Sequence, residues 1–174
     1  EMCMPMAENV IAACKANGAA HLFSGNVYNF GKSLPPVLGP ETAEKPETRK
    51  GAIRIEMERL FRNAVLRDGV STTVLRAGDF YGGTGSGSWF DLMIATKVDK
   101  GKFVWPGRAD IAHAWAYLPD LGKAFVKVAE RQGELEGFNV LTFEGHTLKR
   151  PLGENSNAAQ CHGLCYAQPD LWCR

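Results

Sequence analysis

Three segments of the chain carry apolar residues at the spacing of one helix face. The first follows Pro5 and stops at Gly18, the second spans residues 48–69 and stops at Gly69, and the third begins at Pro119. Proline is favoured in the first turn of a helix and glycine just beyond the last turn. The pattern predicts three helices with these apolar faces: Met6, Val10, Ile11 and Cys14; Ile53, Met57, Leu60, Phe61, Ala64 and Val65; and Leu121, Ala124, Phe125, Val128 and Ala129.

Short runs of apolar and β-branched residues separate these helices and predict strands. They are AAHLFSG, VSTTVLRAGDFYGG, KFVWPG, AHAWAY and GFNVLTFEG. A further helix of weaker periodicity is expected over WFDLMIATKVDKG, and the proline-rich stretch 32–46 is expected to be a surface loop. Strands that alternate with helices of this length favour parallel pairing through right-handed crossovers. The predicted class is α/β.

The regular pattern ends near His146, which predicts a domain over residues 1–148 and an irregular tail over 149–174. The tail carries Cys161, His162, Cys165 and Cys173. A zinc site is one interpretation, but the cysteine spacing lacks the paired pattern of structural zinc sites. An irregular tail that binds no metal is the other interpretation.

Composition excludes several classes of partner. The 174 residues include 20 basic and 19 acidic side chains, so the net charge of +1 gives no field for nucleic acid or an anionic membrane. No apolar run approaches the ~20 residues of a membrane span, and the first residues do not resemble a signal peptide. Five unevenly spaced cysteines without an export signal favour reduced thiols. We expect a cytoplasmic location.

The stretch YGGTGSGSWF, residues 81–90, raises the question of a phosphate-binding loop. A dinucleotide fingerprint needs glycines spaced two and then three apart, and the third position is Ser88 in one frame and Phe90 in the other. A P-loop needs Lys followed by Ser or Thr, and Gly87 is followed by Ser88 and Trp89. We therefore expect a substrate lid closed by Trp89 and Phe90, with phosphate binding as the alternative.

Four stretches together resemble the landmarks of one enzyme family. They are LFSGNVYNFG, KGAIRIEME, TVLRAGDFYG and HAWAYLPDLGKAF, and they cover roughly residues 5–148. In this order they resemble the extended short-chain dehydrogenases/reductases, in the NAD-dependent epimerase/dehydratase group. The resemblance implies a partial Rossmann-like, doubly wound sheet that binds NAD or NADP, with a small substrate-binding region mostly within residues 80–120. It also implies a fragment that lacks the glycine-rich pyrophosphate-binding half of the family.

The resemblance assigns catalytic positions on one strand and one helix. Ser24 lies where the family has the Ser or Thr that hydrogen-bonds the reacting oxygen, although a strand-end Ser also bonds its own backbone. The family Tyr and Lys fall on Lys50 and Arg54, and Glu58 follows where the family often has Glu. Lys50 is either a replacement base or part of a solvated, basic helix start. Tyr28 is another phenol, which we expect to be packed rather than catalytic.

Further positions follow from the same resemblance. Cofactor contacts are expected at Ser24, Arg54, Ala77 and Gly78. The substrate positions are Asn26, Asp79, Phe80, Trp89 and His113.

Asp79 replaces an Asn, and His113 an Arg, of the sugar-nucleotide epimerases. An anion and a neutral imidazole hold a diphosphate poorly, so we expect a small substrate without one. Trp105, Trp115 and Phe90 either line an apolar pocket or belong to the core. We read Asp120 as a helix cap.

Two functions remain open at this stage. The first is an NAD(P)-dependent epimerase, dehydratase or reductase-like activity on a small carbonyl or hydroxyl substrate. The second is a non-catalytic member of the same fold that senses dinucleotide or binds a partner, because the phenol is lost. The resemblance also implies a homodimer through the helices at 5–17 and 49–67.

Overall fold

The structure, a computed structural model, describes residues 2–35, 38–39, 42–84, 87–104, 113–148 and 161–163. As far as their residues are described, these form two compact units. Unit 1 contains Glu1–Arg76 and Phe125–Thr142. Unit 2 contains Ala77–Ala124 and Phe143–Tyr166. The α/β class and the partial Rossmann-like architecture predicted from the sequence are confirmed.

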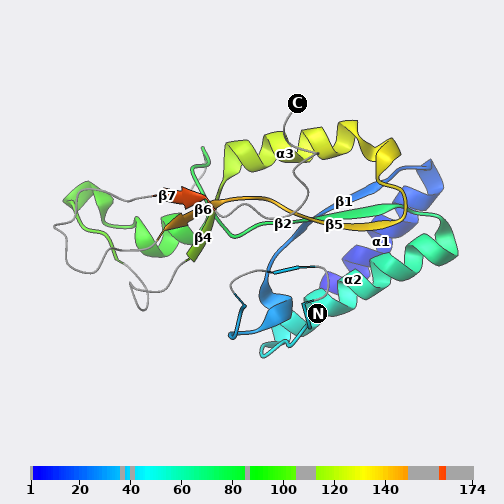
Figure 1. Cartoon of the computed structure of the whole chain (residues 1–174), viewed down its shortest axis with the longest axis horizontal. Helices are drawn as coiled ribbons and strands as arrows, with labels where there is room; N and C mark the ends of the chain where they lie inside the picture. The colour runs from blue at the N-terminus through cyan, green and yellow to red at the C-terminus, as the bar shows by residue number, and fades with distance from the viewer. Residues whose placement is uncertain are drawn as a thin grey trace. The chain divides into compact units, whose positions relative to one another are not determined.

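Unit 1 is built on a parallel sheet with the strand order β1-β2-β5 (Figure 1). The strands are β1 (His21–Gly25), β2 (Thr72–Arg76) and β5 (Phe138–Thr142). All five residues of the central strand β2 are buried, as its continuous apolar and β-branched composition requires. Parallel pairing of these three predicted strands is confirmed.

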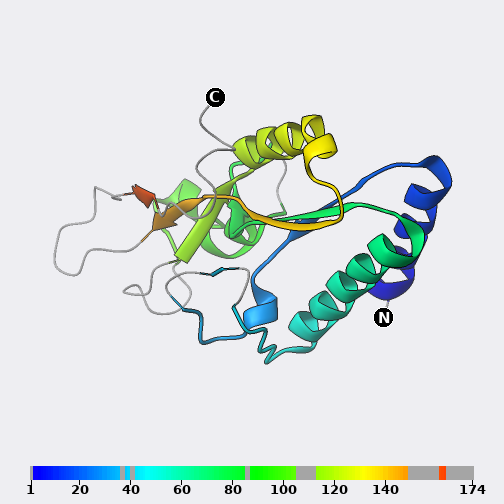
Figure 2. The same cartoon turned by 45° about the vertical axis from the view of Figure 1, so that its right-hand side comes forward.

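Helices α1 (Cys3–Asn17) and α2 (Arg49–Asp68) lie side by side along one face of this sheet (Figures 1 and 2). Thr48 caps α2 by accepting a hydrogen bond from the amide of Gly51 at 3.1 Å. Gly18 and Gly69 end the two helices in the left-handed conformation that glycine favours, as predicted. The core between helices and sheet contains Ala7, Ile11, Met57, Phe61, Ala64 and Val70.

The predicted apolar face of α1 is partly wrong. Met6 and Val10 are 60% and 44% exposed, whereas Ala7 and Ile11 are buried. Ile11 is buried as predicted and Cys14 packs against the same core, so the buried face is shifted from the predicted one towards Met4 and Ala7.

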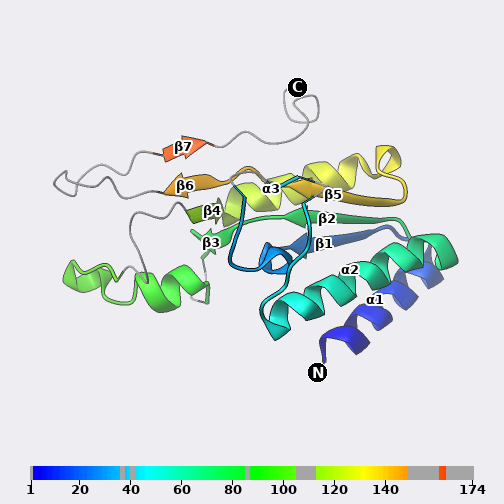
Figure 3. The ribbon, with the colours of Figure 1, turned by 60° about the horizontal axis from the view of Figure 1, so that its bottom comes forward.

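Unit 2 contains a mixed sheet in the order β3-β4-β6-β7 (Figure 3). Strands β3 (Asp79–Tyr81) and β4 (His113–Tyr117) are parallel. Strands β6 (His146–Leu148) and β7 (Cys161–Gly163) continue the sheet in antiparallel fashion. The antiparallel strands were not predicted. The single predicted strand over 70–83 is in fact two strands, β2 and β3, which belong to different sheets.

The segment after the glycine stretch is less helical than predicted. It forms one π-helical turn, η2 (Phe90–Ile94), and one 3₁₀ turn, η3 (Val98–Lys100). Lys102–Val104 are not in a strand, so that part of the KFVWPG prediction is wrong, and Trp105 lies outside the described residues. Two further 3₁₀ turns are η1 (Tyr28–Phe30) and η4 (Gln132–Glu134).

Helix α3 (Leu118–Glu130) begins one residue earlier than predicted. Asp120 therefore lies within the first turn and accepts a hydrogen bond from Lys123 at 2.8 Å, so the prediction that it is the cap is wrong. Leu121, Ala124 and Val128 are buried as predicted, whereas Ala129 is exposed.

The predicted irregular tail lies outside the described residues except for β7. Among the described side chains, no group of His, Cys, Asp and Glu has the arrangement of a metal site. Cys165 and Cys173 fall outside that range, so the zinc interpretation of the tail stays untested. No helix in the described part of the chain has the length and apolarity to cross a membrane.

Candidate functional site

The carboxyl end of β1 presents three predicted polar residues. Ser24 pairs in register with Leu75 of β2, and its side chain is exposed. Asn26 accepts a hydrogen bond from the backbone amide of Tyr28 through Oδ1 at 3.0 Å, which holds the turn after the strand. Tyr28 is 46% exposed, so the prediction that it is packed is wrong. Its carbonyl oxygen instead lies against Gly51 at the start of α2, where any larger residue would collide with it.

The basic residues of α2 differ in their surroundings. Lys50 is exposed in the first turn, while Arg54 is half-buried with its guanidinium 5.3 Å from the ring centroid of Phe23. Phe23 packs among the side chains of α1 and α2. Ser24 is the next residue along β1 and therefore faces the other side of the sheet. Because Arg54 of α2 lies over Phe23, the structure places Ser24 and Arg54 on opposite faces of the sheet.

A buried ion pair joins α2 to the end of β2. Arg76 donates two hydrogen bonds to Glu58, at 2.9 and 2.7 Å, and a third to the carbonyl of Asn26 at 2.8 Å. Asn29 donates to the same carboxylate at 3.0 Å, and the guanidinium lies 5.2 Å from the ring centroid of Phe30. Both charged side chains are only 8% exposed.

Sequence reasoning noted Glu58 but missed its partner. The available signal was an acidic residue on the buried face of a helix together with an arginine that ends an otherwise uncharged strand, because buried charges are almost always paired.

Ala77 and Gly78 follow β2, where cofactor contacts were predicted. Ala77 is buried with 4% exposure. A Cβ on Gly78 would collide with the carbonyl group of Ala114 in β4. The packing of β4 against Gly78 is therefore enough to explain why this residue is glycine. A cofactor could contact only its backbone atoms.

Two predicted substrate residues of unit 2 contact each other. Nε2 of His113 lies 2.7 Å from Oδ2 of Asp79. The side chains are 38% and 35% exposed, respectively. Asp79 is in register with Trp115, two positions beyond His113, so strand alternation puts all three side chains on one face. Phe80 has the opposite parity and faces the other side, so the structure does not bring it together with this pair.

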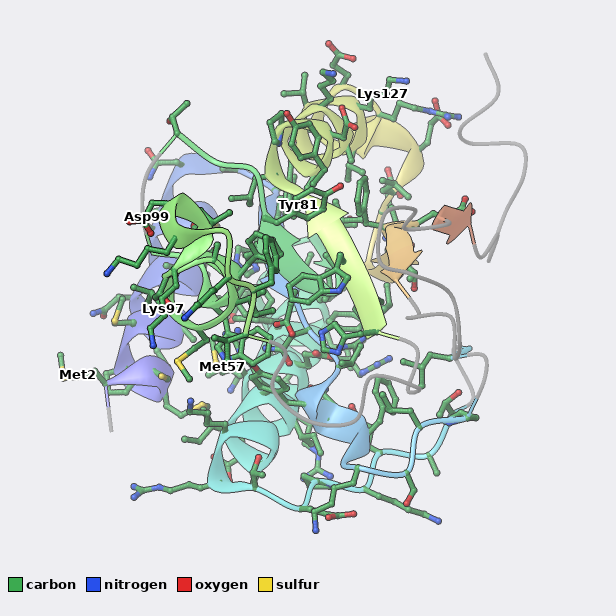
Figure 4. The ribbon with its side chains drawn as sticks, turned by 90° about the vertical axis from the view of Figure 1, so that its left-hand side faces the viewer. Met2, Met57, Tyr81, Lys97, Asp99 and Lys127 are labelled. Carbon is green, nitrogen blue, oxygen red and sulfur yellow. The ribbon has the colours of Figure 1, made fainter. Side chains whose placement is uncertain are left out.

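His113 belongs to an aromatic cluster, in which its ring contacts Trp89 and Trp115. Another member of the cluster, Tyr81, is labelled beside β4 in Figure 4. Trp89 stacks on His113 at a centroid distance of 6.2 Å and an interplanar angle of 18°, and on Trp115 at 6.0 Å and 24°. Trp89 is 41% exposed, whereas Trp115 is fully buried and thus belongs to the core. The aromatic cluster consists of Tyr81, Trp89, Phe90, Phe103, His113, Trp115 and Tyr117.

The glycine stretch packs against the aromatic cluster at Gly82 and forms hydrogen bonds at Ser88. Gly82 has a φ of 77°, and a Cβ there would collide with the ring of Tyr117. At the other end Ser88 Oγ donates to Asp91 at 2.6 Å and accepts from the amide of Asp91 at 3.1 Å. A carboxylate at this helix start disfavours a bound phosphate. Residues 85–86 lie outside the described ranges, and the substrate lid stays a prediction.

The fold is similar to that of several solved enzymes. The UDP-glucose 4-epimerase from Brucella ovis, solved in complex with NAD, matches 82% of this chain with a TM-score of 0.69 at 16% identity. The dTDP-glucose 4,6-dehydratase DesIV from Streptomyces venezuelae, solved with NAD bound, matches 82% with a TM-score of 0.65 at 12% identity. The L-threonine dehydrogenase from Phytophthora infestans matches 78% with a TM-score of 0.63 at 19% identity.

The chain spans less than half of each of these structures: 49%, 44% and 47% of their lengths. No family model matches the sequence, and a search of curated proteins finds no relative. At these identities the likeness establishes the fold alone. The resemblance to NAD-dependent epimerases and dehydratases that the four sequence stretches predicted is confirmed at that level.

Proposed function

We propose that the protein is an NAD(P)-dependent epimerase, dehydratase or reductase-like protein that acts on a small carbonyl or hydroxyl compound. The observation that supports this proposal is the fold, which matches NAD-dependent epimerases over about four fifths of the chain. The sequence stretches that resemble the family lie on β1, at the start of α2, and on β2 and β4 with the residues that follow these strands.

The residues at the carboxyl end of unit 1 fit part of a dinucleotide. The exposed hydroxyl of Ser24 is available to a ligand, and the half-buried guanidinium of Arg54 supplies a fixed positive charge for a ribose hydroxyl. The sequence contains no Gly-x-Gly-x-x-Gly stretch for a pyrophosphate. When bound, NAD or NADP would supply hydride transfer chemistry.

Unit 2 supplies the substrate side of the proposal. Asp79 and His113 present a partly exposed carboxylate and imidazole, and Trp89 covers the imidazole ring. A carboxylate at this position favours hydroxyl donors and opposes phosphate. This arrangement supports a small substrate without a diphosphate.

A non-catalytic dinucleotide sensor or partner-binding protein of the same fold is the second candidate. One observation favours it: Lys50, at the position of the family phenol, is exposed in the first turn of α2. An exposed lysine on a basic helix start commonly serves only solubility.

Titration of the chain with NADH and NADPH, followed through nucleotide fluorescence, tests the proposal. Saturable binding is expected, and Arg54→Gln should weaken it about fivefold or more, since a hydrogen bond to a charged group is lost. Arg62→Gln is the matched control, because Arg62 makes a similar contact with Phe138, at 4.2 Å. Oxidation of NADH in the presence of small aldehydes and ketones supports the enzyme. Binding without turnover supports the sensor, and no binding contradicts both.

We also propose that the protein forms a homodimer through α1 and α2. Met2, Met6 and Val10 form an exposed apolar stripe on α1, and Leu66 is exposed on α2. These side chains stay in water in a single chain, although apolar residues at helical spacing normally pack. The double variant Met6→Glu/Val10→Glu should halve the mass measured by light scattering. Val98→Glu, at an exposed apolar site in unit 2, should leave it unchanged. A monomeric wild-type protein contradicts this proposal.

A further inference from the structure

We propose that Asp79 and His113 form an acid–base dyad, in which Nδ1 of His113 exchanges a proton with the reacting hydroxyl or carbonyl oxygen of the substrate. The inference deepens the proposed function and rests on it, because it assigns the proton-transfer step that the family phenol performs. The sequence resemblance placed that step on Lys50, in unit 1. The dyad lies entirely within unit 2.

The hydrogen bond between the two side chains determines which ring nitrogen is basic. An ionised carboxylate can only accept, so at 2.7 Å from Oδ2 of Asp79 the neutral imidazole keeps its proton on Nε2. The lone pair is then on Nδ1. When Nδ1 takes up a proton, the carboxylate stabilises the resulting imidazolium. A hydrogen-bonded partner that fixes the tautomer and the ring orientation is what a general base requires.

The surroundings keep the imidazole oriented and accessible. Trp89 lies nearly parallel to its ring, and the ring of Trp115 is 4.7 Å away, centroid to centroid. Asp79 is the charged group that contacts His113 among the described residues. With about a third of each side chain exposed, a small molecule can reach the pair.

The alternatives in unit 1 are chemically less suited. Arg54 cannot release a proton in water, and Lys50 has the exposure of an ordinary surface lysine. In the proton step assigned to the dyad, the substrate O–H bond breaks, the proton moves to Nδ1, and the electron pair stays on the oxygen. The reverse transfer protonates the oxygen of a product.

The dyad can be tested without knowing the substrate, by using hydrolysis of p-nitrophenyl acetate. Nδ1 of His113 attacks the acyl carbon and p-nitrophenolate leaves with the electron pair, which gives an acyl-imidazolium that keeps its proton on Nε2. Water then hydrolyses this intermediate to acetic acid and a proton, and the neutral imidazole is restored. His113→Gln should lower the protein-dependent rate about tenfold or more, and Asp79→Asn about threefold or more. Asp91→Asn, a carboxylate of the same unit that bonds Ser88, should stay within about twofold of wild type. Circular dichroism verifies that each variant is folded.

A second measurement reports the tautomer directly. Long-range ¹H–¹⁵N correlation spectra should show the proton of His113 on Nε2 in the wild-type protein and a shift towards the other tautomer in Asp79→Asn. A wild-type rate in His113→Gln, a loss of rate in Lys50→Ala instead, or a proton on Nδ1 would each overturn the dyad. Failure of NADH binding with an intact esterase signal would reject the proposed function and leave the dyad standing.

Discussion

Each unit of the molecule contains a hydrogen-bonded pair of a carboxylate and a nitrogen-bearing side chain, and the two pairs have opposite surroundings. In unit 1, Arg76 and Glu58 are 8% exposed and joined by two hydrogen bonds. In unit 2, His113 and Asp79 are more than a third exposed and joined by one. Burial with every charge satisfied makes a pair structural, since its charges cannot be reached from solvent. Partial exposure, together with a second ring nitrogen that has no hydrogen-bond partner among the described residues, makes the other pair chemically available.

The two sheets also differ in how exposed their side chains are. Unit 1 has a purely parallel sheet whose central strand is fully buried. Unit 2 has a mixed sheet whose β3 and β4 carry a partly exposed aromatic cluster. The strands of unit 2 therefore carry aromatic and polar side chains that a ligand can contact, whereas the central strand of unit 1 carries only buried ones.

The largest effect is expected from Arg76→Met. It leaves Glu58 as an unpaired buried carboxylate and should lower the free energy of unfolding by about 3–5 kcal/mol in urea titrations. The double variant Arg76→Met/Glu58→Met should recover much of this loss, because no charge then remains buried. Arg67→Met is the control, since Arg67 is exposed and lies 3.9 Å from Asp68. An Arg76→Met protein as stable as the control would remove the contrast between the two pairs.

The next effect concerns a glycine that the sequence assigned to cofactor binding. Gly78→Ala places a Cβ against the carbonyl of Ala114 and should cost about 1–3 kcal/mol through separation of β3 from β4. Gly122→Ala makes the same chemical change within α3, where nothing lies within 4 Å. It should stabilise the protein by up to about 1 kcal/mol. If Gly78→Ala keeps full stability and only weakens NADH binding, the cofactor assignment is correct and the packing explanation fails.

The glycines show which parts of the fold can be predicted from the sequence and which cannot. Helix ends at Gly18 and Gly69 were predictable because a glycine after an apolar helical face has a local cause. The parallel strands were predictable because β-branched runs alternate with helices. The break at Gly78 was not predicted, although Ala77, Gly78 and Asp79 are residue types of low strand propensity, because the sequence does not show that β4 lies against Gly78.

The residues of the candidate site in unit 2 were predicted from the sequence, but the contact between them was not. Asp79 and His113 were each assigned to the substrate through the resemblance, and their contact arises from a register between strands 34 positions apart in sequence. Sequence spacing carries no information about such a register. The exposure of Met6 and Val10 was missed for a related reason. Each has an apolar neighbour, Ala7 and Ile11, so the sequence offers two helix faces that could be buried.

A smaller effect is expected from the pH dependence that His21 gives to unit 1. Burial against Phe23 and Phe61 lowers the pKa of His21 below the usual 6.5. The unfolded chain therefore takes up this proton at a higher pH than the folded chain does, so stability falls as the pH drops below about 6.5. His21→Gln should flatten the change in unfolding free energy between about pH 7.5 and about pH 5.5. An equal slope in both proteins would contradict this assignment.

The smallest effect on stability is expected from Asp79→Asn, and this near absence of an effect is informative. Asparagine keeps the volume of the side chain and can still form a hydrogen bond with His113. The pair is more than a third exposed, so water already solvates the carboxylate, and losing its charge should change the unfolding free energy by less than about 0.5 kcal/mol. A loss comparable to that of Arg76→Met would mean that Asp79 and His113 hold unit 2 together, as Glu58 and Arg76 hold unit 1. A stable variant with reduced reactivity towards p-nitrophenyl acetate separates the two pairs by function, because the same class of interaction then supports folding in one unit and chemistry in the other.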